Sequence, residues 1–223
     1  MNTLKTFIIV HKLKILILLP VFALAIGVCF VQIPDRTKIK RKFKIEYLII
    51  HYTANFNPRA TARMNATYLR NKRQAGTHYC VDDQEIVQCT PEHMVAYSVG
   101  DRIWRGFTPK PWLMSNGRRK VLNHNSLSFE MCLGGNRNDS LIIDKTAQMI
   151  GWQLVNKGLD ISRVIRHHDV TGKHCPKFAY NENWNQIKED SSFNEFKKKV
   201  EFYQNIHLEI KRKNKLKSAK IVQ

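Results

Sequence analysis

The sequence is poor in acidic residues: 18 Asp and Glu stand against 37 Lys and Arg, which gives a formal charge of +19. Such an excess predicts affinity for polyanions such as nucleic acid, anionic lipid or acidic polymers. The sequence has no internal repeat and no recognisable nucleic-acid-binding motif, so we expect no nucleic-acid partner. Its 223 residues leave room for one domain with tails, large enough to fold alone.

Cysteine is also scarce, with five residues in the chain. Cys80 and Cys89 flank a stretch with the pattern of a hairpin. They could form a disulfide if the protein is exported and their Cα atoms come within about 7 Å. A sequence poor in cysteine is still compatible with export.

Long hydrophobic runs are limited to one, residues 15–31, which follows a short basic lead with Lys12 and Lys14. The run is at the lower length limit of a membrane-spanning helix and is somewhat long for the core of a signal peptide. We therefore predict that residues 1–34 are either a signal peptide or a membrane anchor. Residues 35–44 follow as a basic linker, predicted to be a solvated spacer that touches anionic lipid headgroups.

Residues 166–176, RHHDVTGKHCP, hold three imidazoles, a thiol, a carboxylate and an ammonium group. Imidazole nitrogen and thiolate sulfur are the preferred ligands of zinc. Because the run ends in Gly-Lys-His-Cys-Pro, we predict a loop rather than a helix, and this loop could return Cys175 to the side of His167. The alternative is a solvated loop with surface histidines.

A second stretch, residues 47–54, has the pattern of a buried strand that carries His51 near its end. His51, His167 and Cys175 would offer two nitrogens and one sulfur to a metal ion. A fourth position would stay open, as is typical of a catalytic zinc site. His168 is the rival ligand, because an extended backbone would point it away from its neighbour His167.

Four segments carry a family resemblance: IIHYTAN, AGTHYCVDDQEIVQ, NSLSFEMC and RHHDVTGKHCP. In this order and at these spacings, the sequence resembles the type 2 N-acetylmuramoyl-L-alanine amidases, which share their fold with peptidoglycan recognition proteins. The resemblance covers about residues 44–178. It implies bound Zn²⁺ and hydrolysis of the amide bond between N-acetylmuramic acid and L-alanine in peptidoglycan. The alternative is a peptidoglycan-binding protein of the same fold without catalysis, which the intact site residues disfavour.

The expected fold class is α/β: a single domain with a central mixed β-sheet flanked by helices, preceded by the N-terminal apolar membrane-targeting segment. We place the zinc amidase domain at residues 45–180 and a C-terminal helix with a basic tail at residues 181–223. The helices and strands behind this expectation are strands at 47–54, 127–132 and 162–165, a hairpin at 76–89, and helices at 60–71, 144–159 and 192–210. In the first helix, Met64, Ala66, Tyr68 and Leu69 are expected to pack on the sheet.

Two charged residues are the candidate catalytic groups. Glu130 lies inside an apolar strand, and because burying an unpaired carboxylate is costly, we interpret it as the general base; a structural ion pair is the alternative. Lys173 stands two residues before Cys175, so its ammonium group could stabilise the oxyanion of the tetrahedral intermediate. Asp169 and His174 are expected to orient the loop.

Two further positions are ambiguous in the sequence. His78 could be a core histidine or a residue that orients the ligands or the substrate. Thr77 stands where many members of the resembled family carry an aromatic hydroxyl, so the role of such a hydroxyl is in doubt here.

The location follows from two opposed arguments. The basic residues after the apolar run favour a cytoplasmic domain if the run is a retained anchor. The implied substrate lies outside the cell, and we give that argument more weight, so we expect a membrane-anchored or exported protein in the periplasm or cell exterior. Expected partners are peptidoglycan, and anionic envelope polymers or lipid through the basic segments.

Overall fold

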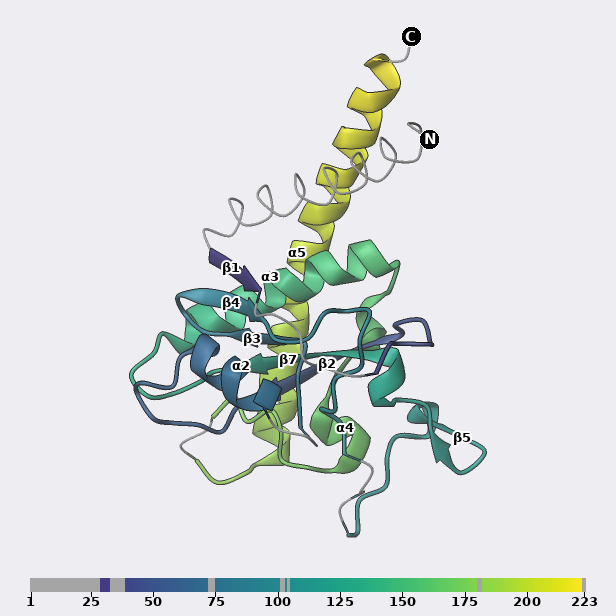
Figure 1. Cartoon of the computed structure of the whole chain (residues 1–223). Helices are drawn as coiled ribbons and strands as arrows, with labels where there is room; N and C mark the ends of the chain where they lie inside the picture. The colour runs from purple at the N-terminus through teal and green to yellow at the C-terminus, as the bar shows by residue number, and fades with distance from the viewer. Residues whose placement is uncertain are drawn as a thin grey trace.

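The computed structural model describes residues 29–32, 39–71, 75–100, 103, 105–179 and 182–221. Its architecture is α/β, a mixed sheet between helices, as expected from the sequence (Figure 1). The strands are β1 (Cys29–Gln32), β2 (Tyr47–Tyr52), β3 (Tyr79–Val81), β4 (Glu85–Gln88), β5 (Met114–Ser115), β6 (Arg118–Arg119), β7 (Ser126–Met131) and β8 (Val164–Arg166). The α-helices are α2 (Ala62–Asn71), α3 (Asp139–Lys157), α4 (His167–Thr171) and α5 (Gln186–Ile221), and the 3-10 helices are η1 (Pro111–Leu113), η2 (Asn123–Asn125) and η3 (Ile161–Arg163).

The main sheet has six strands in the order β1-β4-β3-β7-β2-β8. Strands β3, β7, β2 and β8 run parallel to one another, and β4 is antiparallel to β3. The predicted hairpin is confirmed as the β3–β4 pair, in which Asp82 accepts backbone N–H bonds from Gln84 at 2.8 Å and Glu85 at 2.7 Å. Carboxyl ends of parallel strands meet at one edge of a sheet, and ligands bind there in open α/β folds.

The two faces of the sheet are covered differently. Alternate strand residues such as Leu48, Ile50 and Phe129 pack with α3 and α5 in the largest apolar cluster. Their neighbours face the other side, where α2 covers β3 and β4. His51 follows Ile50 in the strand, so its side chain points to the α2 face, because successive side chains alternate across a sheet.

Helix α2 corrects one expectation about its packing. The side chains buried against the sheet are Ala62, Asn65 and Ala66, whereas Met64 and Tyr68 are 56% and 59% exposed. Residues spaced by three or four share a helix face, and the spacing from Ala62 places Met64 and Tyr68 toward solvent.

Helix α5 begins before the predicted range and extends beyond it. Its first half packs on α3, where Phe193, Phe196 and Val200 are buried. The basic stretch 211–217, expected to be a solvated tail, continues the helix with exposed side chains (Figure 1).

Part of the segment predicted to be a signal peptide or membrane anchor forms a strand of the sheet. Strand β1 lies within the range 1–34 assigned to a signal or anchor and pairs in parallel with β4. Residues 1–28 lie outside the described part of the chain. None of the described helices is both long and apolar enough to cross a membrane.

Arg41 corrects the expectation of a solvated linker at residues 35–44. Its guanidinium donates to the carbonyls of Glu92 at 2.8 Å, His124 at 2.7 Å and Ser126 at 2.9 Å. Residues 39–41 also pair with the segment around Met94. This part of the linker therefore belongs to the domain, because one guanidinium supplies hydrogen bonds to several otherwise unpaired carbonyls.

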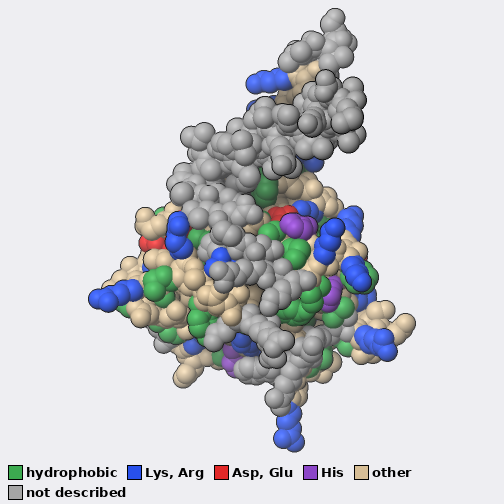
Figure 2. Space-filling view, in the orientation of Figure 1, with side chains coloured by type: hydrophobic (Ala, Val, Ile, Leu, Met, Phe, Trp, Pro, Cys, Tyr) green, Lys and Arg blue, Asp and Glu red, His purple; other side chains and the backbone are tan. Residues whose placement is uncertain are grey.

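The visible face of the molecule reflects the composition. Figure 2 shows Lys and Arg side chains spread over this face and few Asp and Glu. The excess positive charge is therefore a property of the folded surface.

Candidate active site

Three neighbouring parallel strands, β7, β2 and β8, deliver the central residues of the site. His51 and Glu130 are register partners near the carboxyl ends of β2 and β7. Strand β8 ends at Arg166, and His167 follows as the first residue of α4. His51, Glu130 and His167 lie 37 to 116 positions apart in the sequence and meet because their strands are adjacent.

The motif at 166–176 is not a continuous loop, which corrects the sequence-based expectation. Residues His167–Thr171 form the short helix α4, and only the residues after it are a loop. Gly172 ends the helix with a φ of +80°, and a Cβ there would lie 2.4 Å from the Phe107 ring. Only glycine fits both the left-handed backbone and this close approach.

The loop after α4 turns Cys175 back toward the strands. The backbone N–H of His168 donates to the carbonyl of Cys175 at 2.8 Å, and the N–H of Cys175 donates to the carbonyl of Lys173 at 2.7 Å. The peptide bond between Cys175 and Pro176 is cis. These two hydrogen bonds fix the thiol over the end of β2.

His51, His167 and Cys175 converge as the sequence predicted, and we call them the His-His-Cys trio. Their candidate ligand atoms all lie within 4.8 Å of one another, and all three residues are buried. Cys175 Sγ is 3.8 Å from His51 Nδ1, and the His51 and His167 ring centroids are 4.7 Å apart. Two imidazoles and a thiol within this distance match the donor set of a zinc ion.

The local electrostatics also fit a metal. Burial, with the nearby His167 and Lys173, holds the pKa of His51 well below its usual value, so the imidazole is neutral and able to ligate. Burial raises the pKa of the Cys175 thiol, so a thiolate there requires a cation beside it. Nε2 of His51 is buried and has no hydrogen-bond partner among the described residues. The three residues therefore suit a bound Zn²⁺.

His168 does not join this group. Its Nδ1 lies 3.2 Å from the carbonyl oxygen of Lys173. Its ring packs against Phe107 and Trp184, with ring centroids 5.2 Å and 4.9 Å away. Successive residues of a helix point about 100° apart, so α4 directs His167 to the trio and His168 into this aromatic cluster.

Glu130 lies beside the trio. Its Oε1 is 4.0 Å from His51 Nδ1, and its Oε2 is buried without a hydrogen-bond partner in the described chain. Burial raises the pKa of Glu130 to about 7, although the Lys173 charge opposes the shift. A carboxyl group with this pKa can both accept and release a proton near neutral pH.

Lys173 lies at the rim of the same cavity. The cavity has a volume of about 480 Å³, within the range for small-ligand sites, and Glu130, Lys173 and the three candidate metal ligands line it. Lys173 itself is exposed. Its charge therefore faces the space above the trio.

A buried ion pair supports α4 from beneath. The Arg166 guanidinium donates to Asp169 Oδ1 at 2.8 Å and lies 2.7 Å from Asp190 Oδ1 on α5. Although burial raises it, hydrogen bonding from Arg166 lowers the pKa of Asp169 below its usual value. Asp169 also accepts the N–H of Arg166 at 2.9 Å, so it fixes the start of α4, where His167 stands.

His174, the other residue expected to orient the loop, stacks on Trp184. Their ring centroids are 4.4 Å apart and the planes differ by 3°. His174 also lines the cavity. The stack ties the tip of the loop to the segment that leads into α5.

His78 and Thr77 belong to the core rather than to the cavity wall. His78 Nδ1 lies 3.0 Å from Ser128 Oγ, and its Nε2 lies 2.9 Å from the Arg41 guanidinium. Burial and the Arg41 charge lower the pKa of His78 to about 3. The Thr77 hydroxyl donates to the backbone carbonyl of Ser128 on β7 at 3.1 Å. Of the two readings, the structure supports the core histidine.

Cys80 and Cys89 are close but carry free thiols. Their sulfur atoms are 3.6 Å apart, and both residues are buried with Cys132 in the cluster under α2. The hairpin brings the two cysteines together diagonally, since Cys80 is paired with Val87. The disulfide considered from the sequence is not formed.

Sequence analysis missed several residues that line the cavity. The tyrosines among them come from three segments: Tyr52 from β2, Tyr68 from α2 and Tyr97 from the loop after Pro91. Asn55 and Asn65 are joined by a 3.1 Å side-chain hydrogen bond. The position of Asn55 inside IIHYTAN was a usable signal, and so was the resemblance of residues 92–100, which include Tyr97, to a cleft-wall loop of the amidase family.

Comparisons with known proteins cover the part of the chain that holds this site. A family model described as N-acetylmuramoyl-L-alanine amidase matches residues 41–178. The N-acetylmuramoyl-L-alanine amidase CwlA of Bacillus subtilis is 31% identical over 159 residues, which cover 68% of this chain and 50% of that protein. The amidase CwlL of Bacillus licheniformis is 31% identical over 185 residues, covering 77% and 45%. The chain thus spans about half the length of the curated relatives it matches.

A solved structure shares the fold. A mutant endolysin from Bacillus subtilis aligns with a TM-score of 0.58 and 22% identity, covering 78% of this chain and 99% of the other. At this identity the likeness concerns the fold alone.

Proposed function

Because the chain belongs to the N-acetylmuramoyl-L-alanine amidase family, we propose that it hydrolyses the amide bond between N-acetylmuramic acid and L-alanine in peptidoglycan with the help of zinc. One observation carries the proposal. His51, His167 and Cys175 converge within 4.8 Å, beside the partly buried carboxylate of Glu130, on the wall of a cavity.

His51, His167 and Cys175 would hold the metal. Bound there, Zn²⁺ would polarise the scissile carbonyl as a Lewis acid and make a water molecule more acidic. The protein supplies two imidazoles and one sulfur ligand, and the backbone hydrogen bonds of the 172–176 loop hold Cys175 in place.

Glu130 would move the proton. We assign it to accept a proton from the attacking water and to deliver that proton to the nitrogen of the leaving L-alanine. Its position on β7, 4.0 Å from His51, keeps it beside the reacting atoms. Its free Oε2 gives it an acceptor for this proton.

Lys173 would stabilise the negative charge that develops on the carbonyl oxygen. An ammonium group aimed at that oxygen helps the transition state more than the substrate, because the oxygen gains charge during attack. The same loop carries Lys173 and Cys175, so both are positioned together.

The test is digestion of purified peptidoglycan by the protein, followed by mass analysis of the fragments. We expect stem peptides released with a free L-alanine amine, and loss of this product in a zinc chelator. Binding to peptidoglycan without fragment release would instead identify a non-catalytic binding protein of the same fold.

We further propose that the domain acts outside the cytoplasm, because its substrate is there. The apolar run at residues 15–31 supports this, and the basic residues after it oppose it. A reporter fused after Gln223 tests the location. Activity of that reporter only in the cytoplasm would refute export.

A further inference from the structure

The distal part of α5 extends past the domain. Near the point where α5 leaves α3, Lys211 Nζ donates to the carbonyl of Val155 at 3.4 Å. All side chains described at positions 208–218 are exposed. A helix of 36 residues is about 54 Å long, and Figure 1 shows its C-terminal end projecting beyond the sheet. We call residues 208–221 the basic arm.

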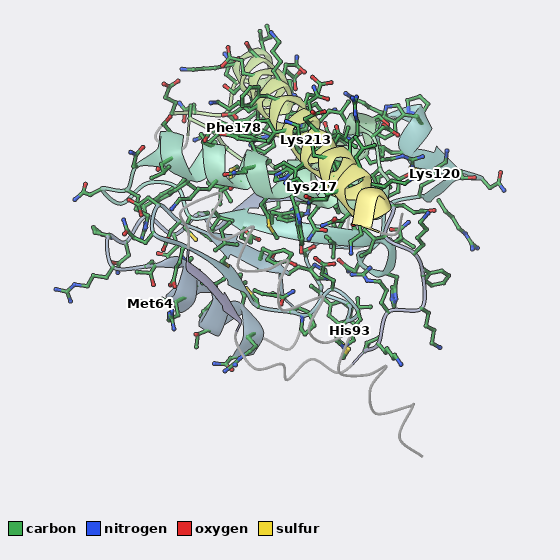
Figure 3. The ribbon with its side chains drawn as sticks, turned by 90° about the horizontal axis from the view of Figure 1, so that it is seen from above. Met64, His93, Lys120, Phe178, Lys213 and Lys217 are labelled. Atoms are coloured by element: carbon green, nitrogen blue, oxygen red, sulfur yellow. The ribbon has the colours of Figure 1, made fainter. Side chains whose placement is uncertain are left out.

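The basic arm carries charge of one sign. It contains six Lys or Arg and one acidic residue, Glu209, which pairs with Lys213 at 3.4 Å. Lys213 and Lys217 lie on the exposed length of the helix (Figure 3), four positions apart. Like charges at this spacing repel and destabilise a helix. An anionic surface would stabilise this part of the helix, because it offsets the repulsion between the Lys and Arg side chains and supplies contacts that the domain does not.

The direction of the arm narrows the choice of surface. Strand β1 and the end of α5 lie on one side of the molecule, and α4 lies on the other (Figure 1). The loop 172–176 that follows α4 lines the cavity with Lys173, His174 and Cys175. The apolar run at residues 15–31 leads into and includes most of β1, so the hydrophobic part of the chain joins the domain on the side of the arm. Exposed Leu208, Ile210 and Leu216 add apolar side chains to the arm.

We propose that the basic arm binds the surface of an anionic phospholipid bilayer and thereby directs the cavity away from the membrane. Each Lys or Arg near such a surface strengthens binding about fivefold. The charges surround the helix rather than forming one face, so the attraction is to headgroups and is sensitive to salt. This inference does not depend on the proposed hydrolysis.

The experiment uses the full chain bound to vesicles of phosphatidylcholine, with or without 30% phosphatidylglycerol. Because the apolar run can carry the chain to either vesicle, the readout is backbone amide hydrogen exchange in residues 208–221. We expect exchange to be at least about tenfold slower on the anionic vesicles at low salt, because bound helices open less often. High salt is expected to abolish the difference.

A matched pair of variants isolates the arm. Substituting Arg212, Lys213, Lys215 and Lys217 by Gln should abolish the effect of phosphatidylglycerol, while Arg at the three lysine positions should retain it. Substituting the exposed cations Arg59, Arg105, Arg118 and Lys120 by Gln changes the net charge by the same amount. This variant should retain the effect of phosphatidylglycerol on exchange in the arm.

Three results would overturn the proposal. The first is equal exchange on neutral and anionic vesicles. The second is loss of the phosphatidylglycerol effect to the same extent in both quadruple Gln variants. The third is slowing by soluble teichoic acid, a phosphate polymer, without slowing by anionic vesicles, which would assign the arm to envelope polymer instead of lipid.

Discussion

Glu130 and His51 are register partners on neighbouring parallel strands, with Glu130 Oε1 4.0 Å from His51 Nδ1. The two side chains lie on the same face because paired residues of adjacent strands point the same way. This pairing joins the proposed proton carrier to a candidate metal ligand through rigid sheet backbone. The relative position of these two residues thus depends on strand register rather than on loop conformation.

Because His167 belongs to the His-His-Cys trio and His168 does not, substituting each by Ala should change the zinc content differently. His167→Ala should lose zinc, because the variant retains only His51 and Cys175. His168→Ala should retain about one zinc per chain, because His168 contacts the carbonyl of Lys173 and an aromatic cluster. Elemental analysis of both purified proteins checks this. Zinc retained in the first and lost in the second would move the ligand to His168.

Glu130→Gln should reduce kcat by roughly 10²–10⁴ because it removes proton transfer. The amide matches the carboxylate in shape, so zinc content and fold should be unchanged. Kinetics on a muramoyl-peptide with zinc measured in each sample checks the prediction. Glu46→Gln, at an exposed position before β2, is the control and should be near normal. Normal turnover in zinc-loaded Glu130→Gln would leave Glu130 a structural role only.

Lys173→Ala should lower kcat by about 10²–10³, similar to the loss of an oxyanion-hole donor. The effect should fall on kcat more than on KM, because the ammonium group acts on charge that appears in the transition state. Lys177→Ala, further along the same segment, is the comparison variant. A raised KM with unchanged kcat would make Lys173 a substrate-binding residue instead.

His78 should make stability depend on pH. Its pKa is about 3 in the folded protein because of burial and Arg41, and about 6.5 when unfolded. The unfolded chain therefore binds more protons between these values, so this contribution is present above pH 6.5 and declines as pH falls. From pH 7 to pH 5 the loss is about 2 kcal/mol.

Denaturant unfolding of the wild type and His78→Gln at both pH values measures this contribution. The variant should lose about 2 kcal/mol less than the wild type over the same interval. An identical pH dependence of the two proteins would show that His78 is not responsible.

Gly151→Ala should loosen the contact between α3 and α5. A Cβ at Gly151 would lie 2.8 Å from the backbone nitrogen of Gln204 and 3.0 Å from the carbonyl oxygen of Val200. Overpacking costs about 1–3 kcal/mol, which exceeds the gain of up to ~1 kcal/mol from Ala in a helix. Thermal unfolding should show a net loss of stability. At Gly100 a Cβ meets nothing within 4 Å, so Gly100→Ala is the control and should be neutral.

Much of this protein could be predicted from its sequence. The strand at 47–54, the hairpin and the helix at 144–159 followed from apolar periodicity, because side chains alternate in strands and recur every three to four residues in helices. The candidate ligands His51, His167 and Cys175 followed from residue chemistry, since few side chain types bind zinc. The family motifs added the order in which these pieces occur.

The tertiary structure determined those conformations and contacts that local sequence patterns do not specify. It made the first half of the metal motif helical, which separates His167 from His168, because packing against Arg166 and α5 selects one of several local conformations. It turned Arg41 from a linker charge into a bond donor for distant carbonyls. It also placed Tyr68 at the cavity wall instead of against the sheet. These outcomes depend on contacts between residues far apart in the chain, whereas periodicity and motif chemistry act over a few residues.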